Sequence, residues 1–165
     1  MTQSMEPLVD GRTAPAPVPG IRTIVIGADG SAGAELALEW AAQVGEPMGA
    51  TVIAVHVVTA NRALAKDFSF ETIHTWRREL EAQLRGPWVE PLRRRHVPYR
   101  CVMTEHDTAA SGLVHAARQA HADLIVVGSR GRSSLTLTST SHVLNHRAEC
   151  PVVVVPPRWQ PAPAP

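Results

Sequence analysis

Apolar and polar positions follow two different rhythms along the chain, one typical of β-strands and the other of α-helices. Short, almost continuously apolar runs predict strands that are covered on both faces. These runs lie at residues 24–28, 51–58, 99–103, 123–128 and 151–155. Between them, helical patterns occupy residues 34–44, 70–96, 109–120 and 139–147. Gly45 and Pro47 are expected to end the first helix, and Gly86-Pro87 to break or kink the second.

Five strands that alternate with helical connections predict the class of the fold. A strand, a helix and a second strand form a right-handed crossover, which places the two strands parallel in one sheet. Repeating this unit covers the sheet with helices on both faces. We therefore expect a doubly wound α/β domain with a five-stranded parallel sheet.

Segments rich in proline and alanine frame this pattern at both ends. Residues 1–20 finish in Ala-Pro-Ala-Pro-Val-Pro-Gly, and residues 158–165 finish in Pro-Ala-Pro-Ala-Pro. Such segments bury little apolar surface, so both are expected to be disordered tails. Residues 21–157 form the expected single domain, which suits a chain of 165 residues.

The composition and net charge indicate which partners and which cellular compartment to expect. The formal net charge of +1 gives no electrostatic reason to expect nucleic acid or a membrane surface as partner. No apolar run is long enough to span a bilayer, and residues 1–20 lack the apolar core of a signal peptide. The protein is expected in the cytoplasm, with Cys101 and Cys150 reduced and serving as small apolar side chains.

Two loops at the carboxyl ends of strands carry the residues best suited to a ligand. In a doubly wound sheet, ligands bind beyond these ends, beside helix N-termini that attract anions. Residues 27–31 (GADGS) follow the first strand, and residues 128–134 (GSRGRSS) follow the fourth. Backbone amides and hydroxyls of this kind suit phosphate oxygens, although the same residues are also ordinary turn formers. No Gly-Lys-Ser or Gly-Lys-Thr follows, so this is not a Walker-type loop.

Other reactive residues give weaker signals. His142 and His146 are four positions apart, a spacing that could present two metal ligands, but no third ligand is evident and a solvated helix end is favoured. His56 lies in a buried strand and is expected to be a hydrogen-bonded core residue. The cluster at residues 93–96 (RRRH) fits a helix end, where cations are stabilised. No catalytic residues and no metal ligands are assigned.

An ordered set of short motifs resembles the universal stress protein family. The motifs are residues 24–31 (IVIGADGS), 55–57 (VHV), 126–132 (VVGSRGR), 141–142 (SH) and 150–152 (CPV). Each motif alone is only weakly specific, but the ordered set is specific to the family. The resemblance covers residues 22–156. The resemblance implies an adenine nucleotide alpha hydrolase-like sheet with the strand order 3-2-1-4-5. It also implies a nucleotide cleft between strands one and four.

The same resemblance implies which residues would hold ATP, with Mg²⁺ as its counterion. Asp29 and Val57 would hold the adenosine, and Gly128 and Gly131 would line the ribose and phosphates. ATP-binding members then carry a Gly-Ser/Thr pair, which falls here on Thr138-Ser139, so that Ser139 and Thr140 would face the phosphates. The sequence departs from the pattern at this step. The loop is three residues short, and a threonine cannot adopt positive φ as cheaply as the usual glycine.

A regulatory or protective stress-response protein that binds ATP or another adenine nucleotide is the function this implies. A homodimer is also implied, and the β-prone edge strand Val152–Val155 is suited to pairing with a second copy. The alternative is a member that binds no nucleotide and acts as a dimer through protein contacts, with the short loop as its signature. A nucleotide hydrolase or transferase is disfavoured, because no base or metal cluster is visible.

Overall fold

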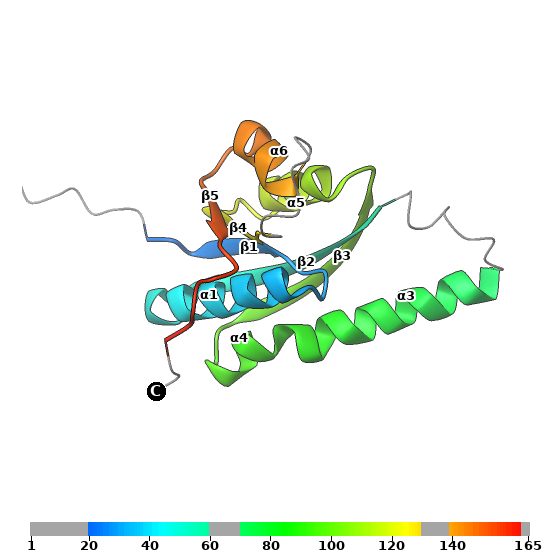
Figure 1. Ribbon diagram of the computed structural model, residues 1–165, viewed down its shortest axis with the longest axis horizontal. Helices are drawn as coiled ribbons and strands as arrows, with labels where there is room; N and C mark the ends of the chain where they lie inside the picture. The colour runs from blue at the N-terminus through cyan, green and yellow to red at the C-terminus, as the bar shows by residue number, and fades with distance from the viewer. Residues whose placement is uncertain (1–19, 60–69, 130–138, 163–165) are drawn as a thin grey trace, which may run out of the picture.

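The computed structural model describes residues 20–59, 70–129 and 139–162, and a parallel sheet lies at its centre (Figure 1). Every pairing between neighbouring strands is parallel, and the strand order is β3-β2-β1-β4-β5. The strands are β1 (Thr23–Gly27), β2 (Thr51–Thr59), β3 (Tyr99–His106), β4 (Leu124–Gly128) and β5 (Val152–Val155). This order confirms the predicted doubly wound α/β fold.

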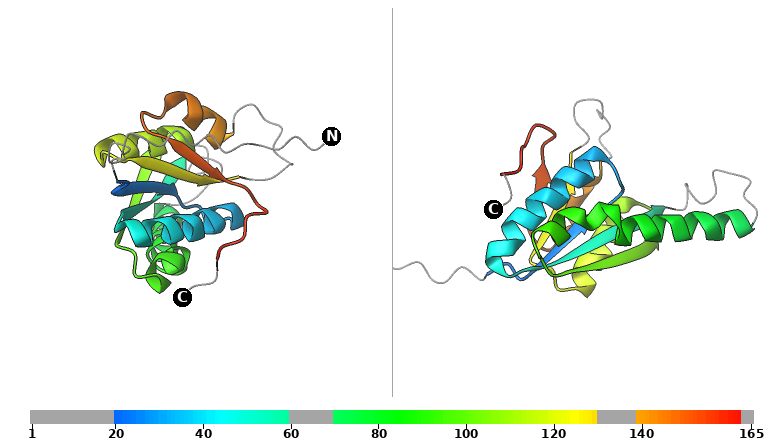
Figure 2. Two further views of the ribbon diagram at one scale, coloured as in Figure 1. Left: turned by 90° about the vertical axis from the view of Figure 1, so that its left-hand side faces the viewer. Right: turned by 90° about the horizontal axis from the view of Figure 1, so that it is seen from below.

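Helices cover both faces of the sheet, as Figures 1 and 2 show from three directions. The helix α1 (Ala32–Met48) packs on one face beside α4 (Glu90–Arg94), and α3 (Phe70–Arg85) lies on the same side. The opposite face carries α5 (Ala109–Gln119) and α6 (Thr140–Arg147), which contact each other. The amino-terminal part of α3 extends well beyond the sheet.

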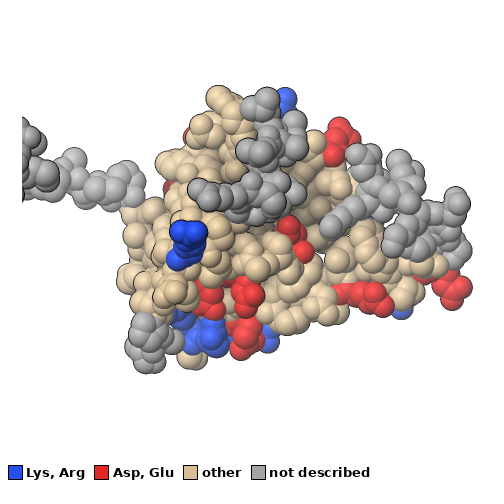
Figure 3. All heavy atoms as spheres, in the orientation of Figure 1, with Lys and Arg blue, Asp and Glu red and all other residues tan. Residues whose placement is uncertain are grey.

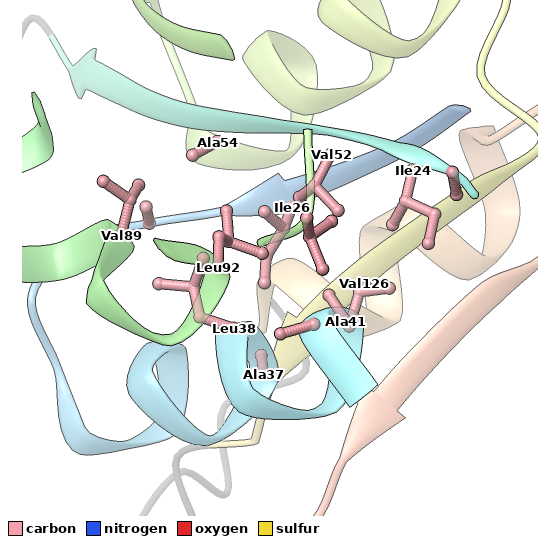
Figure 4. Packing of buried hydrophobic residues seen from close by; sticks show 14 of the residues in the cluster. Ile24, Ile26, Ala37, Leu38, Ala41, Val52, Ala54, Val89, Leu92 and Val126 are labelled. Atoms are coloured by element: carbon pink, nitrogen blue, oxygen red, sulfur yellow. The ribbon is translucent and has the colours of Figure 1, made fainter. Parts of the chain in front are cut away.

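The alternation of side chains along β1 explains why its apolar run is continuous. Ile24 and Ile26 are fully buried in the core between the sheet and α1 (Figure 4), whereas Val25 is fully buried in the core beneath α5. Successive side chains of a strand point to opposite faces, so a strand between two helical layers needs apolar residues at every position.

The helix α1 continues one turn beyond its predicted end at residue 44. Pro47 lies inside its last turn, and the helix stops at Gly49, whose φ of 62° is left-handed. The amide of Gly49 donates to the carbonyl oxygens of Gly45 and Glu46, which closes the helix. The prediction that Gly45 and Pro47 end the helix was wrong, because glycine is needed for the left-handed cap and not before it.

The predicted break at Gly86-Pro87 is confirmed. The helix α3 ends at Arg85, a short 3₁₀ turn covers Pro87–Val89, and α4 begins at Glu90. A side chain at Gly86 would place its Cβ 2.7 Å from the carbonyl oxygen of Ala82, so only glycine allows the chain to turn here.

The carboxyl-terminal residues pack against the body further than the sequence indicates. Trp159 is half-buried against the core, although residues from 158 onward are expected to form a tail. The amide of Ala162 donates to Oε1 of Gln43 (3.2 Å), and its carbonyl oxygen accepts from the buried Arg95 (3.0 Å). The packed body therefore extends to Ala162. Within the described ranges, no helix combines the length and the hydropathy needed to cross a membrane.

Candidate functional site

A cleft opens at the carboxyl ends of β1 and β4. The strand β1 lies between β2 and β4, so the order of the strands reverses at this point. Loops diverge at such a switch point, which leaves room between them. The described residues enclose about 100 Å³ here. The lining consists mainly of backbone and small side chains: Gly27, Ala28, Asp29, Ser31, Gly33, Ala34, Val55, Val57, Ala109, Leu113, Val127, Gly128 and Thr140.

Four of the six predicted site residues lie together in this cleft. Asp29 comes from the β1–α1 turn, Val57 from β2, Gly128 from the end of β4 and Thr140 from the first turn of α6. Ser139 is not among the described lining residues, and its side chain caps α6 by accepting from the amide of His142 (3.3 Å). Gly131, Thr138 and the length of the loop between them fall outside the described residues.

The β1–α1 turn orients the carboxylate of Asp29. Its Oδ1 accepts from the amide of Ser31 (3.0 Å), and Ser31 in turn caps α1 by accepting from the amide of Ala34 (3.2 Å). Gly30 between them has a φ of 76°, which a residue with a side chain rarely adopts. The turn thus fixes an exposed carboxylate beside the amino terminus of a long helix.

Backbone rather than side chains forms the floor of the cleft at Gly128. A Cβ built on Gly128 would overlap the carbonyl group of Gly33, in the first turn of α1. Beyond it, the amide of Ser129 donates to the carbonyl oxygen of Val155 (2.9 Å), which holds the end of β4 against β5. The two glycines bring β4 and α1 closer than side chains would allow.

Val57 forms the wall of the cleft on the β2 side. It packs against Gly112 of α5, where a Cβ would lie 2.6 Å from both Val57 methyl groups. The start of α5 is fixed by a capping box in which Thr108 and Ser111 satisfy each other's backbone amides (3.1 and 3.3 Å). The position of Val57 therefore depends on a close helix-to-strand contact.

Trp88 and His56 contact the β1–α1 turn at Gly30 and Ala28. His56 is buried, and its Nδ1–H donates to the carbonyl oxygen of Ala28 (2.8 Å), as expected for a core histidine. The Trp88 ring lies 5.3 Å from the His56 ring and so close to Gly30 that a Cβ there would approach it to 2.7 Å. The sequence gives no signal for this contact, because Trp88 lies in the short 3₁₀ turn after α3.

A second cavity of about 360 Å³ lies on the outer side of Trp88, between α1 and α4. It is lined by Glu35, Glu39, Glu90 and Arg94 together with apolar residues, and Arg94 pairs with Glu39. On the face shown in Figure 3, acidic and basic side chains mingle along this edge of the molecule. Glu90 pairs with Arg93, which lies outside the cavity lining.

The groups with shifted pKa values lie away from the cleft. Burial raises the pKa of both the Cys101 and the Cys150 thiols, which disfavours the reactive thiolate. At the opposite end of the sheet, hydrogen bonds from the amides of Arg22 and Thr23 lower the pKa of Asp123. Among the described residues, no three potential ligands gather closely enough to hold a metal ion.

A comparison with models of protein families identifies the family of this chain. A model of the universal stress protein family matches residues 20–156. The chain belongs to the universal stress protein family. The observed sheet order is the one that the resemblance to this family implies.

Solved structures of universal stress proteins have the same fold. One from Burkholderia pseudomallei is 27% identical with a TM-score of 0.67, and the match covers 88% of this chain and all of that one. One from Archaeoglobus fulgidus in complex with dAMP is 21% identical with a TM-score of 0.58, over 82% of this chain and 98% of that one. One from Arabidopsis thaliana with AMP bound is 19% identical with a TM-score of 0.60, over 82% and 90%. No curated protein matches the sequence.

Proposed function

We propose that this universal stress protein binds an adenine nucleotide in the cleft between β1 and β4. The observation that carries the proposal is the meeting of Asp29, Val57, Gly128 and Thr140, from four separate segments, around one cavity. Two universal stress proteins of the same fold are described as bound to AMP and to dAMP, which supports adenine nucleotides as the ligand class.

The chemistry of the cleft suits a nucleoside monophosphate. Val57, Leu113 and Val127 supply apolar surface against which a base can pack, and the oriented carboxylate of Asp29 can accept hydrogen bonds from the nucleoside. The Thr140 hydroxyl and the first turn of α6 can meet a phosphate. An enclosed volume of about 100 Å³ is below the range of sites that bury a whole ligand. We therefore expect the base to be enclosed and the phosphates to lie at the open mouth.

ATP with Mg²⁺ is the more specific form of the proposal. Mg²⁺ is usually held by substrate phosphates, one or two carboxylates and waters. Asp29 is the one carboxylate among the described residues of the cleft, so the metal would arrive with the phosphates. We propose binding rather than catalysis, because that lining contains no histidine or cysteine to serve as a base or nucleophile.

Calorimetric titration of nucleotide-stripped protein tests the proposal. AMP and Mg-ATP are titrated into the wild type, Asp29→Ala and a matched control, Asp107→Ala, whose exposed carboxylate lies outside the cleft. Micromolar binding that is lost in Asp29→Ala and kept in the control is the expected result. Binding of AMP without ATP would favour the monophosphate. Silence with both nucleotides up to millimolar concentration would overturn the proposal and favour a protein that acts through its partners.

We also propose a homodimer through β5. This strand pairs with β4 on one side only, and the apolar side chain of Val154 on it is 42% exposed. Pairing with a second copy would cover both the free edge and Val154. Sedimentation of Val154→Glu tests this, with Met48→Glu, at an exposed apolar position on α1, as control. The wild type and Met48→Glu should be dimers and Val154→Glu a monomer. A monomeric wild type, or a dimeric Val154→Glu, would contradict the proposal.

A further inference from the structure

A groove with an unusual composition runs between α5 and α6, outside the nucleotide cleft. It consists of two neighbouring cavities of about 420 and 590 Å³. Both are lined by His146 and Arg147 of α6. The first reaches the amino-terminal turns of both helices, and the second continues along α5 to the end of β3. We call the two together the α5–α6 groove.

Basic and hydroxyl side chains line this groove, and none of its described lining residues is a carboxylate. The polar and ionisable members are Thr108, Thr140 and His142 in the first cavity, His106, Ser111, His115 and Arg118 in the second, and His146 and Arg147 in both. The rings lie in pairs, with centroids 5.0 Å apart for His106 and His115, and 4.9 Å apart for His142 and His146. Such a set offers hydrogen-bond donors and positive charge to an anion.

The balance of charge around the groove favours an anion over a metal cation. Arg147 has no ion-pair partner in the part of the chain that the structure describes. Arg118 pairs with Glu149 near the end of α6. Each histidine pair lacks a third ligand among the described residues, and two guanidinium groups beside them would repel a metal ion.

The length of the groove indicates an extended ligand. Its α5 side runs from Ala109 to Arg118, and nine helical steps of about 1.5 Å each give roughly 14 Å. A single phosphate cannot reach from one end to the other, whereas a chain of several linked phosphates can. The groove is also joined to the nucleotide cleft, because Ala109 and Thr140 line both.

We propose that the α5–α6 groove binds a chain of linked phosphates. Four histidine side chains and two guanidinium groups line it, and each can donate hydrogen bonds to phosphate oxygens. The carboxylates on the surrounding elements are Glu105, which pairs with Arg77, Glu149, which pairs with Arg118, and Asp107 in the β3–α5 turn. None of these three carboxylates lines the groove itself. This site does not require the cleft to bind a nucleotide.

Titration with sodium tripolyphosphate at constant ionic strength tests the proposal. The variant His146→Gln/Arg147→Gln removes the two residues that both cavities share, at exposed positions. The matched control His74→Gln/Arg78→Gln removes the same side chains from exposed positions on α3. We expect the wild-type and control proteins to bind tripolyphosphate with equal affinity. The α6 variant should lose about tenfold in affinity or more, since an arginine–phosphate contact is charge-assisted.

Further measurements distinguish a free phosphate chain from the phosphates of a nucleotide in the cleft, and test other ligands for the groove. Asp29→Ala should leave tripolyphosphate binding unchanged, and loss there instead of in the α6 variant would place the anion in the cleft and overturn the proposal. If the tail of a cleft-bound nucleotide is the ligand, the α6 variant weakens adenosine tetraphosphate but not AMP. If a free chain is the ligand, it weakens tripolyphosphate alone. Sulfate binding as tight as tripolyphosphate, or Zn²⁺ binding that the α6 variant abolishes without any tripolyphosphate binding, would each contradict a phosphate-chain site.

Discussion

Gly128 and Gly33 touch through their backbones, and this contact sets the spacing between β4 and α1 at the floor of the cleft. A Cβ on Gly128 would overlap the Gly33 carbonyl group, and a Cβ on Gly33 would lie 3.0 Å from the carbonyl oxygen of Ser129. The obstacle is backbone on both sides, so it cannot be relieved by rotating a side chain. Of the two positions, Gly128 therefore has the stricter requirement for glycine.

Replacing Gly128 with alanine is expected to destabilise the protein by about 3 kcal/mol, because the added methyl group must displace the first turn of α1. The free energy of unfolding, measured in urea, checks this. Gly20→Ala is the control, since nothing lies within 4 Å of a Cβ at that position and its stability should be unchanged. Equal stabilities for the two variants would show that β4 and α1 are not in contact at Gly128.

Removing the Trp88 side chain should loosen the β1–α1 turn. Trp88 packs against both Gly30 and the buried His56, so Trp88→Ala leaves a gap behind the turn that presents Asp29. We expect a loss of about 3 kcal/mol in the free energy of unfolding, at the low end for such truncations because Trp88 is only partly buried. Trp88→Phe, which keeps a ring in place, should recover most of the loss. A truncation that costs no more than the phenylalanine substitution would contradict the bracing role.

The sequence predicts the sheet well because most strands are marked by burial on two sides. It predicts the end of a strand less well where the last paired residues are polar. The strand β3 continues from residue 103 to His106, since its polar end still pairs with Val57–Thr59 of β2. The contact between Trp88 and Gly30 has no local pattern, because it depends on how the turn after α3 meets the turn after β1. Four of the residues that the family resemblance implies line one cleft, whereas Ser139 caps α6 and is not in the described lining.

The hydrogen bonds to Asp123 predict a dependence of stability on pH. Its Oδ2 accepts from the amides of Arg22 (2.8 Å) and Thr23 (2.9 Å), and these bonds lower the pKa from its ordinary value of 3.8. A lowered pKa in the folded state means that the stabilisation is present above pH 3.8 and is lost as the pH falls below it. Asp123→Ala should therefore be less stable than the wild type near neutral pH, and the difference should shrink below about pH 4.

Urea unfolding of both proteins across this pH range measures the effect. Asp107→Ala, at an exposed aspartate in the β3–α5 turn, is the control for losing one negative charge. A constant difference between wild type and Asp123→Ala at all pH values would show that the carboxylate charge plays no part in holding the starts of β1 and β4 together.

The last described residues are expected to act as a strap across α1 rather than as a free tail. Trp159 packs against the core, and Arg95, 9% exposed, donates to the carbonyl oxygen of Ala162 as well as to Glu46 (3.0 Å each). Ending the chain after residue 157 removes the Trp159 packing and one acceptor of a buried guanidinium group. We expect this to cost about 2–4 kcal/mol in the free energy of unfolding. Ending it after residue 162 keeps every one of these contacts and should cost nothing. If both truncations unfold at the same urea concentration as the full chain, the strap contributes no stability, and the folded unit ends with β5.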